Sequence, residues 1–89
     1  MTCVIRAVAF ANGIPCPHAG EWIEAFDHDA HDGEGFGVFT DRIEYARRFA
    51  DGAEALAFWN RQSQVRPLRP DGEPNKPLTA LTIVIETLV

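Results

Sequence analysis

The two ends of the chain are its most strand-like segments, and they constrain the fold more than any other feature of the sequence. Residues 3–10, CVIRAVAF, are short, rich in β-branched side chains and almost wholly apolar, which predicts a strand covered on both faces or nearly so. Residues 78–89, LTALTIVIETLV, alternate, with Leu81, Ile83 and Ile85 on one face. We expect these two strands to lie side by side at the centre of one sheet.

The segments between the ends predict further strands and two helices. Residues 21–27 and 36–40 fit short strands separated by a turn with the sequence HDGEG. Helix starts follow at Asp41 and Asp51, each with a glutamate three residues later as in a capping box, and apolar side chains then recur at helical spacing. The order β-β-(β)-α-α-β predicts an α+β fold: a small antiparallel sheet of three to four strands with two helices packed on one face.

A chain of 89 residues suffices for one domain, residues 1–89, which buries roughly 60–65% of its unfolded surface. Strand alternation in residues 21–27 predicts that Glu24 faces the same way as Trp22 and Phe26, and that Asp27 faces with Ile23 and Ala25. The expected core is Val4, Ile5, Val8, Tyr45, Phe49, Leu56, Trp59, Leu81, Ile83 and Ile85.

Charge is distributed unevenly along the chain. Residues 1–41 hold seven acidic residues and one base, whereas residues 42–89 hold six acidic residues and seven bases. A nucleic-acid binder usually carries a basic stripe, so direct binding to DNA or RNA is not expected. An acidic face attracts basic protein surfaces or cations instead. We therefore expect a protein partner with a basic surface.

The expected binding surface lies in the acidic segment that follows Glu21. Its candidate residues are Glu24, Asp27, Asp29, Asp32 and Glu34, with Phe58 as an aromatic anchor. Phe58 falls towards the polar side of the second predicted helix, where it is either exposed or covered by a loop.

The alternative function is a metal- or thiol-dependent small enzyme or sensor built on Cys16, His18, His28 and His31. These residues lack the two tight pairs of a structural zinc site. Pro17 also fixes the backbone between the cysteine and the first histidine, and no third residue that orients a base is identifiable. We expect no catalytic residue, no metal and no cofactor, and hence a protein that is not an enzyme.

The compartment is inferred from the cysteines and from the first residues. Two cysteines are too few for a disulfide scaffold, and the apolar run at the start carries no basic leader and is interrupted by Arg6. This favours a cytoplasmic protein with reduced thiols and no membrane segment.

Two stretches carry a resemblance to known proteins: GVFTDRIEYARRFADGAEALAFW at 37–59 and VRPLRPDGEPNKPLTALTIVIE at 65–86. They are similar to small uncharacterised accessory proteins of bacterial genomes and prophages, which have no established activity. The resemblance implies a bacterial or phage setting and an accessory role, and it transfers no catalytic residue. Anti-CRISPR proteins are small acidic phage proteins that occupy basic surfaces of host machinery. An anti-CRISPR-like inhibitor of nucleic-acid-handling machinery is thus one concrete form of the expected function.

Overall fold

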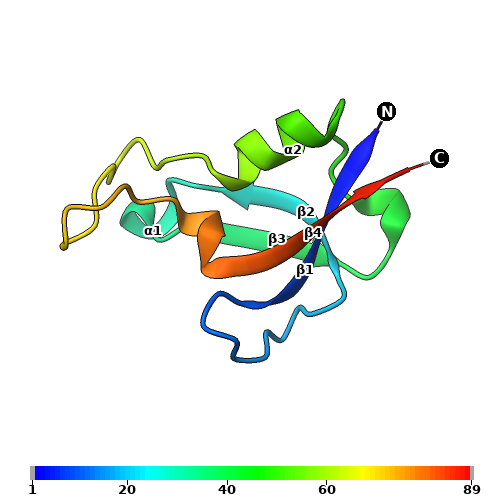
Figure 1. Ribbon diagram of the computed structural model, residues 1–89, viewed down its shortest axis with the longest axis horizontal. Helices are drawn as coiled ribbons and strands as arrows, with labels where there is room; N and C mark the ends of the chain where they lie inside the picture. Colours follow the sequence, from blue (N-terminus) through cyan, green and yellow to red (C-terminus); the bar gives the residue numbers. More distant parts are fainter. Residues whose placement is uncertain (1, 89) are drawn as a thin grey trace.

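The computed structural model describes residues 2–88 and shows a four-stranded antiparallel sheet in the order β3-β2-β1-β4 (Figure 1). The strands are β1 (Cys3–Phe10), β2 (Trp22–Asp27), β3 (Phe36–Thr40) and β4 (Leu81–Thr87). The other elements are the helical turn α1 (Ala30–Gly33), the helix α2 (Gly52–Trp59) and the 3-10 turns η1 (Ile43–Tyr45) and η2 (Pro77–Ala80). The predicted α+β class is confirmed. None of the helices within residues 2–88 has the length and apolar character needed to cross a membrane.

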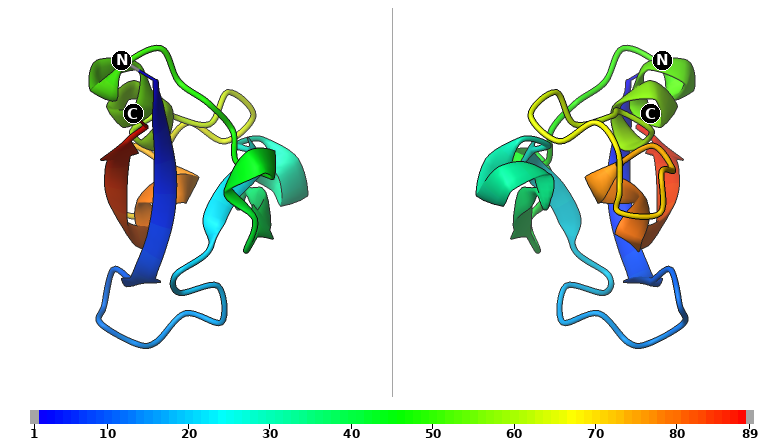
Figure 2. Two further views of the ribbon diagram at one scale, coloured as in Figure 1. Left: turned by 90° about the vertical axis from the view of Figure 1, so that its right-hand side faces the viewer. Right: turned by 90° about the vertical axis from the view of Figure 1, so that its left-hand side faces the viewer.

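The sheet consists of two ribbons that meet over a short stretch. β1 pairs with β4 from Cys3 to Phe10 with one irregularity, and β2 pairs with β3 from Trp22 to Asp27 with another. The register between β1 and β2 contains the single pair Arg6 and Trp22. Figure 2 shows the two ribbons diverging from each other. The terminal strands are adjacent as expected, but β4 lies at the edge of the sheet and not at its centre.

The prediction of a helix after Asp41 is wrong, because only the single turn η1 forms there. The chain then becomes extended and connects the two ribbons: the Arg47 amide donates to the Ile23 carbonyl at 2.8 Å, and Phe49 exchanges hydrogen bonds with Cys3 at 2.8 and 2.9 Å. These bonds pair backbone groups of β1 and β2 where the strands have separated. They replace the helical bonds that the local apolar spacing favours, and they leave Phe49 only 2% exposed.

The helix predicted to follow Asp51 is confirmed as α2, and so is its capping. Asp51 Oδ1 accepts a hydrogen bond from the Glu54 amide at 2.8 Å. The Glu54 carboxylate in turn accepts one from the Ala50 amide at 3.3 Å. The first bond satisfies an amide in the first turn of α2 that has no partner within the helix, and the second satisfies the amide of the residue just before the cap.

The buried face of α2 differs from the predicted one. Ala55 is fully buried, and Phe58 and Trp59 pack against the core, with the indole N–H of Trp59 donating to the Leu81 carbonyl at 3.1 Å. Leu56, predicted to be in the core, is 47% exposed. Residues 55, 58 and 59 follow the i, i+3, i+4 spacing of a helical stripe. The stripe therefore lies on the Phe58 side of Ala55, and the expectation that Phe58 faces the polar side is wrong.

The rest of the expected core divides into three groups. Val4, Ile5, Phe49 and Leu81 are buried, and Trp59, Ile83 and Ile85 are half-buried. Val8 and Tyr45 are exposed, which contradicts the prediction for both. Val8 lies at an irregularity in the pairing of β1 with β4, between Ala7 and Ala9, and Tyr45 lies on η1 and not on a helix.

A bulge at Glu24 determines which side chains of β2 reach the core. Ile23 pairs with Phe39 and Ala25 pairs with Val38, so Glu24 has no partner in β3. An extra residue in one strand breaks the alternation of faces. Ile23 and Phe26 therefore both belong to the core, whereas Ala25 and Asp27 are exposed. The alternation predicted for β2, which placed Asp27 with Ile23 and Phe26 opposite to it, is wrong for this reason.

Candidate functional site

The acidic residues of the predicted binding surface lie on β2 and on the turn around α1, where they have different environments. Glu24, Asp27, Asp32 and Glu34 are exposed. Asp32 lies 3.8 Å from the guanidinium of Arg66, an exposed pair that contributes little stability. Within residues 2–88, the other three carboxylates take part in no ion pair. They remain able to attract a basic partner.

Asp29, by contrast, has a structural role inside the fold. Its Oδ1 accepts hydrogen bonds from the Ser63 hydroxyl at 3.0 Å and from the Gln64 amide at 2.7 Å. The bond from the Gln64 amide is the main cause that lowers the pKa of Asp29 below its ordinary value of 3.8. The carboxylate thus ties the α1 turn to the segment after α2. We leave Asp29 out of the proposed binding surface for this reason.

The four residues of the alternative metal or thiol site are not brought together. Cys16 and His18 share a loop, but His28 is buried between Phe26 and Phe58, and His31 is exposed beside Phe36. Among residues 2–88, no group of three or more histidine, cysteine, aspartate and glutamate side chains has the geometry to hold a metal ion. The geometry therefore gives no support to a site that uses all four.

A pocket of about 300 Å³ lies between the two ribbons, where the loop before β2 approaches η2 and β4. Phe10, Phe26 and Phe39 supply aromatic walls, and Pro77 and Leu81 contribute further apolar surface. We call this cavity the Phe39 pocket. Its polar lining comes from Cys16, His18 and Glu34. Its volume is at the lower limit for small-molecule sites, so it suits one side chain or a small ligand.

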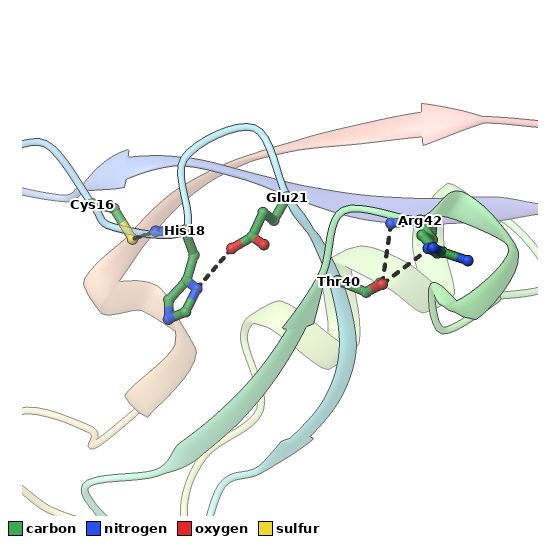
Figure 3. Close-up of polar contacts among 5 residues, drawn as sticks. All are labelled: Cys16, His18, Glu21, Thr40 and Arg42. Carbon is green, nitrogen blue, oxygen red and sulfur yellow. Dashed lines mark hydrogen bonds and ion pairs between the residues drawn. The ribbon is translucent and has the colours of Figure 1, made fainter.

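The loop holds His18 in a fixed orientation against the wall of this pocket. Its ring stacks on Phe39 with centroids 4.2 Å apart, and its Nδ1 lies 2.8 Å from Oε1 of Glu21 (Figure 3). The Cys16 thiol accepts a hydrogen bond from the backbone amide of His18 at 3.4 Å. Among the hydrogen bonds of residues 2–88, none joins the thiol to the imidazole ring. Thiol catalysis requires a hydrogen bond between the nucleophile and its base, and the Cys16 thiol and the His18 ring do not make this contact in the structure.

The outer face of β2 and β3 combines apolar and acidic side chains. Phe36 and Val38 are 55% and 39% exposed. Across the strand pair they meet Asp27 and Ala25 respectively, which are also exposed. We call these four residues the β3 surface. An exposed apolar patch bordered by charged residues is typical of a protein interface.

β3 is also an edge strand, with β2 as its one strand neighbour in the described sheet. Outside the strand pairs, no backbone hydrogen bond within residues 2–88 involves positions 36–40. The Thr40 hydroxyl ends the strand by accepting from the Arg42 amide at 3.1 Å, which turns the chain away (Figure 3). A strand edge with free backbone groups is a template for pairing with another chain.

No protein family, curated protein or solved structure matches this chain. The β3 surface and the Phe39 pocket are therefore candidate sites on the basis of the geometry of this structure alone. The sequence interpretation found Asp27 but missed Phe36, Val38 and Phe39. Alternation in the expected strand at 36–40 was a usable sign of the first two, since it puts them on one face.

The buried His28 gives a prediction about acid. Its Nε2 lies 2.9 Å from the Phe58 carbonyl, which can only accept, so the nitrogen carries the proton. Burial lowers the pKa of His28 below its ordinary value of 6.5, opposed in part by this hydrogen bond. A pKa lowered by folding contributes stability above pH 6.5, and that stability is lost as the pH falls through the folded value. We expect the melting temperature to decrease as the pH is lowered below 6.5.

The His28→Gln variant should lose part of this pH dependence, because its amide stays uncharged. His31→Gln, at an exposed position, is the matched control and should keep the dependence of the parent protein. Thermal melts at a series of pH values measure both. Identical pH profiles for His28→Gln and the parent would show that His28 does not carry the effect.

Proposed function

We propose that the protein is a non-enzymatic binding protein that takes up a basic segment of another protein along the β3 edge. The observation that carries this proposal is the combination of a free edge and two exposed apolar side chains on β3 with the exposed carboxylates of Glu24 and Asp27 on the neighbouring strand β2. Within residues 2–88 these two carboxylates take part in no ion pair, although Asp27 Oδ1 accepts a hydrogen bond from the uncharged Asp29 amide at 2.9 Å. Main-chain pairing along an edge supplies affinity, and alternate side chains supply specificity. The carboxylates of Glu24 and Asp27 select a basic segment by charge complementarity.

The second sheet edge is less suited to this role. β4 exposes Val84 on its outer face, but the nearby Glu86 carboxylate already lies 3.2 Å from Nε of Arg6 and accepts from the indole N–H of Trp22 at 2.7 Å. This charge is used within the fold. The β3 edge therefore has the stronger attraction for a basic partner.

The biological form of this activity is an accessory protein of a bacterium or prophage, which acts on host machinery in the manner of an anti-CRISPR inhibitor. A protein that handles nucleic acid carries basic surfaces that bind phosphates. Carboxylates on β2 and in the α1 turn can occupy such a surface in place of phosphates. The setting itself rests on the resemblance of residues 37–59 and 65–86.

Selection from a phage-displayed library of random peptides tests the chemistry of the proposed partner. We expect the selected peptides to be enriched in arginine, lysine and β-branched residues, and their binding to weaken with salt because charges are screened over about 8–10 Å near physiological ionic strength. The Glu24→Gln/Asp27→Asn variant should weaken binding about tenfold, mainly through a slower association rate. Peptides without an excess of basic residues would contradict the proposal.

A pair of variants on the two edge strands locates the interface. Val38→Lys puts a charge on the β3 edge, where it opposes pairing and repels a basic peptide. We expect binding by the selected peptide to fall at least about tenfold. Val84→Lys makes the same change at a similarly exposed position on β4 and should leave binding nearly unchanged. Loss of binding only in Val84→Lys would place the interface on the other edge.

A further inference from the structure

The Phe39 pocket offers a ligand two kinds of contact. Three phenylalanine rings, from Phe10, Phe26 and Phe39, provide the apolar walls. Glu34 and His18 provide polar atoms. Since Glu34 is exposed and forms no ion pair within residues 2–88, its carboxylate is available to a ligand.

Glu34 supplies the charged acceptor of the pocket, and Cys16 supplies a thiol. A carboxylate offers only acceptor oxygens. In the neutral His18 ring, the N–H at Nδ1 donates to Glu21, which leaves Nε2 with a lone pair. A matching ligand therefore has an apolar stem and a head rich in hydrogen-bond donors.

We propose that the Phe39 pocket receives an arginine side chain of the basic segment that pairs with β3. The guanidinium has donors only, it stacks on aromatic rings, and its three methylene groups match the apolar walls. Two residues that line the pocket belong to the edge strand or adjoin it: Phe39 lies in β3, and Gly35 is the residue just before β3. The pocket therefore adjoins the edge where the segment pairs. This inference rests on the proposed function, because it specifies one residue of the same partner.

Basic side chains neighbour Glu34 outside the Phe39 pocket. Arg66, Arg69 and Lys76 line two neighbouring hollows that Glu34 also lines, and none of the three lines the Phe39 pocket. They share Glu34 with the pocket, so they reduce its attraction for a cation. The aromatic walls and the shape of the pocket therefore carry a larger part of the selectivity than the single carboxylate does.

The test uses single amino-acid amides, which bind without any strand pairing. N-acetyl-arginine amide is titrated into the ¹⁵N-labelled protein, and the backbone amide shifts of Cys16, Gly35 and Phe39 are followed by NMR. The citrulline amide, which has the same shape without the charge, and the norleucine amide, which keeps only an apolar stem, are the comparison ligands. We expect saturable shifts at all three positions with the arginine amide, and binding at least about fivefold weaker with the other two.

Two charge-neutralising variants complete the test. Glu34→Gln should weaken binding of the arginine amide about threefold to tenfold, because a charge-assisted hydrogen bond is lost. Glu44→Gln removes the same charge from η1, outside both the pocket and the proposed binding surface, and should change the affinity less than about twofold.

Three results would overturn the inference: equal binding of the citrulline amide, tighter binding of the norleucine amide, or no shifts at the pocket positions. None of them depends on β3 pairing. If the arginine amide does not bind the Phe39 pocket as expected while peptide binding remains sensitive to Val38→Lys, the inference is wrong and the proposed function stands. If peptide binding is insensitive to Val38→Lys, the proposed function itself is wrong.

Discussion

The Phe49→Ala variant should lose about 3–5 kcal/mol of unfolding free energy, the usual cost of removing a buried aromatic side chain. Phe49 is 2% exposed, and its ring packs on Phe58 with centroids 5.1 Å apart. Its backbone also closes the gap between the ribbons through the two hydrogen bonds with Cys3. Small domains have total stabilities of roughly 5–15 kcal/mol, so this variant comes close to unfolding. Chemical denaturation followed by circular dichroism measures the loss.

Leu56→Ala is the control that separates the observed packing from the packing predicted by helical spacing. Because Leu56 is 47% exposed, its truncation should cost only about 0.5–1 kcal/mol. Equal losses in the two variants would mean that α2 buries its Leu56 side, which contradicts the structure.

The second large effect is expected at Gly33. Its backbone has a φ of +88°, and an added Cβ would lie 2.6 Å from Cβ of Arg66 and 3.0 Å from both Nδ2 of Asn75 and Oγ of Ser63. The Arg66 atom cannot move aside by a rotamer change, because it is attached directly to the backbone. Gly33→Ala therefore combines the left-handed strain of about 1–2 kcal/mol with overpacking of about 1–3 kcal/mol.

Gly72→Ala isolates the strain from the overpacking. Gly72 has nearly the same φ, +85°, but no atom within 4 Å of the position of an added Cβ. It should lose only the strain energy, about 1–2 kcal/mol. Melting curves of the two variants give the difference. If Gly33→Ala were no less stable than Gly72→Ala, the close packing of the α1 turn against Arg66 would be wrong.

Local patterns predicted the strands and the start of α2, because their causes are local. Alternation identified the last strand, and the Asp51 to Glu54 spacing identified the helix cap that the structure forms. The helix expected after Asp41 failed for the opposite reason. Its apolar spacing fits a helix, but the Arg47 and Phe49 amides gain partners in β2 and β1 that are far away in the sequence.

The candidate site was predicted only in part. Charge counting located the acidic half, yet it could not separate Asp29, whose carboxylate is used to hold Ser63 and Gln64, from the exposed Asp27. Nor could it give the bulge at Glu24, which depends on the register with β3. The Phe39 pocket was missed because its walls come from segments as distant as Phe10 and Leu81, which only the folded chain brings together.

Amide hydrogen exchange with a selected basic peptide tests the central claim most directly. Strand addition protects backbone amides that are open at an edge, because each gains a hydrogen bond to the added strand. The account predicts slower exchange at the outward-facing amides of Phe36–Thr40 on peptide binding, with β4 unchanged. Protection at β4, or peptide binding without any protection within Phe36–Thr40, would contradict it.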